Sequence, residues 1–223
     1  MNRSAPFSVE MKFLCCSIQI MQPTLLELTG SKLEVSRFKE SALLIIDAQR
    51  EYQDGALRLQ DFAQALAHCK RALDYARNEA TPIFHIVHHG KTGSPIFDPN
   101  EKYVEIVEEL EPEWGEMIIK KSFPNSFLNT ELHRHLQNLG IKNLIIGGFM
   151  THMCVSSTVR AGLDLGYRST IIANACSTRD LTGFDGLKIP ANLVHTSTLA
   201  ALRDRFAAVV ESIDEIPASA VTM

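Results

Sequence analysis

Short apolar, β-branched runs alternate along this chain with longer stretches of helical spacing, and this alternation restricts the fold more than any other feature. The clearest run, ALLIID at 42–47, is apolar up to its last residue, as expected of a strand buried on both faces. In the stretch that follows it, 59–80, Phe62, Leu66 and Cys69 share one helical face. Further strands are predicted at 82–87, 115–121, 142–148, 167–174 and 207–212, and further helices at 129–140, 151–165 and 191–206.

Strands that alternate with helices favour a parallel α/β sheet, because parallel neighbours need long crossover connections. The helices then cover both faces of the sheet, which gives a three-layer α/β/α arrangement. A chain of 223 residues with 45% hydrophobic and 22% charged residues suits one such domain. We predict a single domain at 41–215, an N-terminal extension at 1–40 and a C-terminal tail at 216–223.

Charge and cysteine content argue against several classes of protein. Lys and Arg number 22 against 26 Asp and Glu, so the net charge of −4 provides no basic surface for nucleic acid or an acidic membrane. No apolar stretch reaches the ~20 residues that a membrane helix needs. The chain has five cysteines without CxxC spacing, which predicts a reduced, cytoplasmic protein and neither a disulfide framework nor a zinc site: Cys15, Cys16, Cys69, Cys154 and Cys176.

Three reactive side chains fall at or just beyond the carboxyl ends of predicted strands, where open parallel sheets bind ligands. They are Asp47, Lys121 and Cys154. Taken singly, each has an ordinary explanation as a cap carboxylate, a solvated lysine or a packed thiol. Together they are what an activated cysteine nucleophile requires. Cys154 falls in the first turn of a helix, where the backbone amides and the helix dipole are expected to lower the thiol pKa.

The segments that carry these residues resemble the isochorismatase-like cysteine hydrolases, which include nicotinamidases and N-carbamoylsarcosine amidases. The segments are LLIIDAQREY, KKSFPNSFLNTEL and LIIGGFMTHMCVSSTVRAGLDLGY, and the similarity extends from about residue 41 to 206. The resemblance implies a Rossmann-like, six-stranded parallel sheet in the order 3-2-1-4-5-6. It also implies Asp47, Lys121 and Cys154 as catalytic residues, since Lys121 has the family's spacing to Phe127 and Lys120 does not.

The resemblance has two further implications. It places a non-proline cis peptide at Phe149–Met150, and it assigns the amides of Met150 and Cys154 to an oxyanion hole. It also leads us to expect a homodimer or a homotetramer.

The histidines after the second strand depart from one branch of this family. Nicotinamidases have an Asp-x-His metal cluster here, whereas IFHIVHHGKTG contains His85, His88 and His89 without that motif. We therefore expect no metal and no cofactor, and His89, at the strand exit, is the histidine expected to face substrate. Candidate pocket residues are Gln49, His89, Phe123 and Phe127, although simple packing explains Gln49 and the two phenylalanines equally well.

The leading hypothesis is a cysteine hydrolase that cleaves an amide or ureido C–N bond of a small molecule through a thioester. Two alternatives stay open: an isochorismatase-type hydrolase of a vinyl ether, which needs no thiol, and a non-catalytic scaffold or ligand-binding protein. A generic nucleotide-binding protein is disfavoured because AQREYQDG, and no GxGxxG, follows the first strand.

Overall fold

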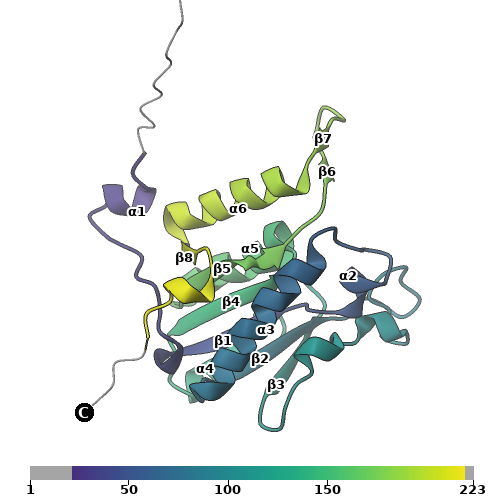
Figure 1. Ribbon diagram of the computed structural model, residues 1–223, viewed down its shortest axis with the longest axis horizontal. Coiled ribbons are helices and arrows are strands. Elements are labelled where there is room, and N and C mark those ends of the chain that lie inside the picture. The colour runs from purple at the N-terminus through teal and green to yellow at the C-terminus, as the bar shows by residue number, and fades with distance from the viewer. Residues whose placement is uncertain (1–21, 219–223) are drawn as a thin grey trace, which may run out of the picture.

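A six-stranded parallel sheet runs through the centre of the computed structural model, which describes residues 22–218 (Figure 1). The strands lie in the order β3-β2-β1-β4-β5-β8. Their bounds are β1 Ser41–Ile46, β2 Ile83–His88, β3 Met117–Lys121, β4 Asn143–Phe149, β5 Arg168–Ser177 and β8 Ala207–Val210. With β8 as the sixth strand, this is the predicted order 3-2-1-4-5-6, so the predicted fold class is confirmed.

Helices cover both faces of this sheet. The helix α3 (Phe62–Asn78) buries its apolar stripe against one face, and Leu43, Ile45 and Ile145 point into that layer from β1 and β4. The opposite layer contains residues of α4 (Leu132–Asn138), α5 (Ser156–Asp164) and α6 (Ala191–Arg205). Because both faces are covered, every residue of β1 is buried, which explains its unbroken apolar run.

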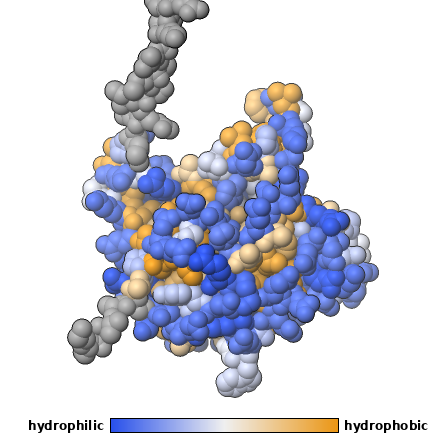
Figure 2. Space-filling model, viewed as in Figure 1, coloured by the Kyte–Doolittle hydropathy of each residue, from blue (hydrophilic) through white to orange (hydrophobic). Residues whose placement is uncertain are grey.

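Two segments differ from the sequence-based expectation. The helix predicted at 151–165 begins with a π-helical turn, Thr151–Val155, before α5. The predicted loop at 182–190 contains an antiparallel hairpin of β6 (Leu181–Thr182) and β7 (Lys188–Ile189), which projects from the body (Figure 1). Phe184 and Leu187 are exposed on this hairpin, and its tip is a hydrophobic spot on a largely hydrophilic face (Figure 2).

The described part of the expected N-terminal extension packs against the domain. In the short helix α1 (Leu25–Leu28), the Leu25 amide donates to Asp204 Oδ1 at 2.7 Å. Further along, Phe38 is 1% exposed in the layer under α3, and its carbonyl accepts the Thr81 hydroxyl at 3.1 Å. Residues 1–21 of the extension and 219–223 of the tail lie outside the described part. Within residues 22–218, every helix is too short or too polar to cross a membrane.

Candidate active site

Asp47 follows β1 directly and lies at the centre of the sheet's carboxyl edge. Its backbone adopts a left-handed conformation with φ 51°, which Asp tolerates better than most residues. The Asp47 amide donates to the Ile86 carbonyl at 2.9 Å, and its own carbonyl accepts the Gln49 amide at 2.8 Å. These bonds hold the turn, and the Asp47 side chain is completely buried.

Lys121 is the last residue of β3, in register with His88 at the end of β2. Strand alternation buries Lys121 and leaves Lys120 exposed. The Lys121 Nζ lies 2.7 Å from Asp47 Oδ2, 3.3 Å from Cys154 Sγ and 3.2 Å from His88 Nδ1. An ammonium group has three protons and no acceptor, so these contacts use its full donor capacity and make His88 Nδ1 an acceptor.

Cys154 reaches the same point from β4. Gly148, with φ 128°, lies so close to β1 that an added Cβ would be 2.1 Å from the Ile46 carbonyl oxygen. Only glycine allows this approach, which brings the residues after β4 beside Asp47. The peptide bond between Phe149 and Met150 is cis, and the π-helical turn that carries Cys154 begins at Thr151.

The buried environment determines the ionisation of this cluster. Burial raises the pKa of the Asp47 carboxyl, against the opposing effect of the Lys121 ammonium. Burial also raises the pKa of the Cys154 thiol, and the Asp47 carboxylate raises it further. The expectation that the helix terminus lowers the Cys154 pKa is therefore wrong, because desolvation and a neighbouring acid outweigh the helix amides. The resting thiol is protonated at neutral pH, next to a carboxylate that can accept its proton.

Comparison with known proteins decides the family. Residues 41–214 match the model of the isochorismatase domain. The chain belongs to the isochorismatase family. An uncharacterized isochorismatase family protein of Bacillus subtilis, YddQ, is 37% identical over 76% of this chain and 94% of its own length. The crystal structure of an isochorismatase from Pseudomonas putida, PP1826, has a TM-score of 0.81 and 42% identity, covering 85% of this chain and 97% of that one. A ureidoacrylate amidohydrolase of Serratia proteamaculans, RutB, is 28% identical over 61% of this chain and 69% of its own length.

Two of the predicted pocket residues, His89 and Phe123, line a cavity that Lys121 also borders. This cavity has a volume of about 220 Å³, and its other lining residues are Lys120, Lys121, Ser122, Leu128 and Asn129. Phe123 is 45% exposed and His89 is half-buried, so both can contact a molecule that enters. Lys121 is the member of the Asp47–Lys121–Cys154 cluster that borders this cavity.

The other two predicted pocket residues are buried in the protein. Gln49 is 0% exposed, and its amide group bonds both the His88 amide, at 2.8 Å, and the His88 carbonyl, at 2.9 Å. Its nitrogen also donates to the Val104 carbonyl at 2.6 Å. Phe127 is 8% exposed and stacks on Tyr167 with ring centroids 5.5 Å apart. Gln49 thus fixes the backbone of His88, and Phe127 belongs to the core.

His88 contacts Lys121 beside the Asp47–Lys121–Cys154 cluster, and sequence reasoning missed this fourth residue. Burial and the nearby Lys121 ammonium lower its pKa to about 4, so its imidazole is neutral. His85, on the opposite strand face, pairs instead with Glu116 at 2.7 Å. Period-two alternation separates His88 from its neighbours, but both faces of β2 are covered, so the pattern does not reveal which face carries the site. One ligand atom each of Asp47, His88 and Cys154 lies within 4.8 Å of the others, a donor set able to hold a metal ion.

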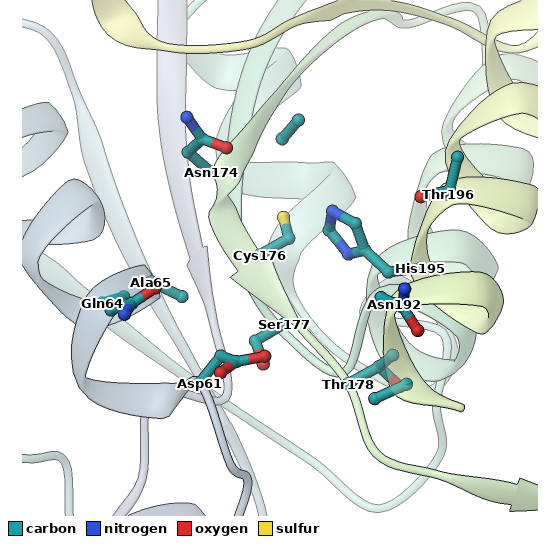
Figure 3. A pocket seen from close by; sticks show the side chains of 12 residues that line it. Asp61, Gln64, Ala65, Asn174, Cys176, Ser177, Thr178, Asn192, His195 and Thr196 are labelled. Carbon is teal, nitrogen blue, oxygen red and sulfur yellow. The ribbon is translucent and has the colours of Figure 1, made fainter.

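A second cavity, of about 200 Å³, lies beside β5 and between the starts of α3 and α6 (Figure 3). Asp61, Cys176 and His195 line it, and it contains none of Asp47, Lys121 and Cys154. His195 nevertheless connects it to the cysteine turn. Its Nδ1 lies 2.8 Å from the Thr151 hydroxyl, which donates to the Ser177 carbonyl at 3.1 Å. Since that hydroxyl has one proton, His195 Nδ1 is the donor and helps to hold Thr151.

Proposed function

We propose that this chain is a cysteine hydrolase that cleaves an amide or ureido C–N bond of a small molecule through a thioester. One observation carries the proposal: the Lys121 ammonium bridges the Asp47 carboxylate and the Cys154 sulfur at the buried carboxyl edge of the sheet. This is the arrangement of acid, cation and thiol that an activated cysteine requires. The similarity to RutB, named as an amidohydrolase, supports the same bond class.

In the proposed reaction, Asp47 accepts the Cys154 proton as the sulfur attacks the substrate carbonyl carbon. Lys121 stabilises the negative charge in this step. When the tetrahedral intermediate collapses, the C–N bond breaks and Asp47 returns the proton to the departing nitrogen. Water then adds to the thioester carbonyl and the C–S bond breaks, which releases the acid and restores the Cys154 thiol.

We further propose that the amides of Met150 and Cys154 bind the oxyanion of the intermediate. In a regular α-helix the Cys154 amide would donate to the Met150 carbonyl. Here that carbonyl accepts the Met153 and Val155 amides instead, at 3.0 and 3.3 Å. The π-helical turn therefore supports a free donor role for the Cys154 amide beside its own sulfur.

The buried thiol beside Asp47 favours C–N hydrolysis over cleavage of a vinyl ether. Ether cleavage requires proton transfer from an acid, which Asp47 can supply without a nucleophile. A sulfur 3.3 Å from a buried ammonium is useful chiefly where it becomes a thiolate.

The test is ammonia release from a panel of small carboxamides and ureido acids, with mass spectrometry of the acid-quenched enzyme. We expect an acyl adduct on Cys154. Cys154→Ala and Asp47→Asn should each lower turnover by about 10³-fold or more. Cys176→Ala, a second buried thiol outside the cluster, should keep the activity. Amide turnover that persists in Cys154→Ala would contradict the proposal, and vinyl-ether cleavage that persists in this variant would favour the alternative.

A further inference from the structure

Metal-binding atoms surround the Lys121 ammonium on three sides. They are a carboxylate oxygen of Asp47, the Nδ1 of His88 and the Sγ of Cys154, all within 4.8 Å of one another. Carboxylate, imidazole and thiolate are the three ligand types that Zn²⁺ takes in proteins. We propose that this cluster is a latent Zn²⁺ site in which the Lys121 ammonium holds the cation position, and that Zn²⁺ can displace it and block the Cys154 sulfur.

The geometry is close to that of a zinc site. Tetrahedral Zn²⁺ with bonds of about 2.0–2.3 Å places its ligand atoms about 3.3–3.8 Å apart. The ligand atoms, now within 4.8 Å of each other, reach that spacing through side-chain movements on the order of 1 Å. Three protein ligands leave the fourth position to water, the pattern of zinc sites with an open position.

The ligand groups are also oriented for binding a cation. The His88 Nδ1 already accepts a hydrogen bond from the Lys121 ammonium at 3.2 Å, so its lone pair points at the site. Gln49 holds the His88 backbone through two hydrogen bonds, which restricts that ligand before metal arrives. Within residues 22–218 the fully buried Oδ1 of Asp47 has no hydrogen-bond partner, so this carboxylate has capacity for another cation.

Binding would proceed with a defined change in charge. The Cys154 thiol loses one proton to solvent, and the Lys121 ammonium moves out toward the cavity lined by His89 and Phe123. The Asp47 carboxylate and the Cys154 thiolate then neutralise Zn²⁺. Because a proton leaves, the zinc affinity should rise with pH. Because a buried ammonium repels the metal, replacing Lys121 with a neutral residue should strengthen binding.

The experiment measures alkylation of Cys154 by iodoacetamide, read by peptide mass spectrometry, in the full chain titrated with ZnCl₂. We expect Zn²⁺ to protect Cys154 and a chelator to restore labelling. In His88→Ala, the Zn²⁺ concentration that protects Cys154 should be at least about tenfold higher, because changes at metal sites usually weaken metal binding by this amount. His68→Ala, on α3 and outside this group of ligands, is the control and should behave as the wild type. Lys121→Met should need about tenfold less Zn²⁺ than the wild type.

A second measurement does not depend on thiol reactivity. Co²⁺ in place of Zn²⁺ should give a sulfur-to-metal charge-transfer absorption in the near ultraviolet that Cys154→Ser lacks. Equal protection in the wild type and in His88→Ala, or identical Co²⁺ spectra in the wild type and in Cys154→Ser, would overturn the proposal. Failure of the amide panel alone would leave these metal readouts unaffected, so the two proposals are tested separately.

Discussion

At the scale of single residues, two charged neighbours act in opposite directions on Cys154. Burial and the Asp47 carboxylate raise its pKa, and the Lys121 ammonium lowers it. The Lys121 ammonium is therefore the neighbour that favours the thiolate, against the two larger influences that favour the thiol. Its neighbour in sequence, Lys120, is exposed and points to the other side of β3.

Replacing Lys121 with Met should shift the pH dependence of Cys154 alkylation to higher pH. The thiol pKa rises when the ammonium is removed, so less thiolate is present at any given pH. A shift of one unit slows labelling about tenfold at a pH below the pKa. The measurement is the iodoacetamide rate at Cys154 from pH 6 to 10 without metal, with Lys120→Met as the control. An unchanged profile in Lys121→Met would show that the ammonium does not control this thiol.

At the scale of secondary-structure elements, an ionic network joins α3, β2 and the start of β3. Arg77 Nε and His85 Nε2 both lie 2.7 Å from oxygens of Glu116. Burial alone would raise the pKa of Glu116, but hydrogen bonds from Arg77, the Glu113 amide and His85 lower it to about 2. This network fixes the strand whose last residue is Lys121.

Glu116→Gln should lower stability at neutral pH, and the deficit should shrink in acid. The folded-state pKa is depressed, so the carboxylate's contribution is fully present above its unfolded value, near 4.5, and is lost as pH falls toward about 2. The measurement is the urea midpoint of the wild type and the variant at pH 7 and pH 3. Glu113→Gln, whose exposed carboxylate also pairs with Arg77, should change far less.

Gln49 joins the carboxyl ends of β1 and β2 at the same scale. Gln49→Ala would leave the His88 amide and the carbonyls of His88 and Val104 without their present partner. Unsatisfied buried groups cost about 1–3 kcal/mol each, so the loss of these three partners should lower the free energy of unfolding by at least about 3 kcal/mol. Gln53→Ala, at an exposed position, is the matched control. A loss below 1 kcal/mol, roughly the worth of a single net hydrogen bond, would mean that these groups find other partners.

At the scale of the whole molecule, the segment before β1 is part of the folded unit. Phe38 packs under α3 and contacts Tyr75, with ring centroids 4.8 Å apart. The Ser36 amide adds a bond of 2.9 Å to Thr170 in β5. The family match begins only at residue 41, so sequence similarity underestimates the domain at this end.

Phe38→Ala should therefore destabilise the entire domain. Removing a buried phenylalanine costs about 3–5 kcal/mol through lost burial and the cavity left behind. Leu28→Ala, at a side chain that is 69% exposed in the same segment, should be close to neutral. Urea unfolding of both variants checks this, and similar stabilities would place Phe38 outside the cooperative core.

The sequence alone was enough for the parallel α/β architecture, because buried strands and amphipathic helices leave local periodic patterns. It also marked Asp47, Lys121 and Cys154, which stand at the recognisable ends of those strands. The pairing of Lys121 with Asp47 and Cys154 in space then follows from the strand order.

Only the tertiary structure decided the place of His88, the buried roles of Gln49 and Phe38, and the raised pKa of Cys154. Each of these depends on contacts between segments far apart in the chain or on how completely a group is removed from water. Local patterns carry neither kind of information. A helix start predicts a stabilised thiolate, but the desolvation and the carboxylate that reverse this prediction come from the assembled fold.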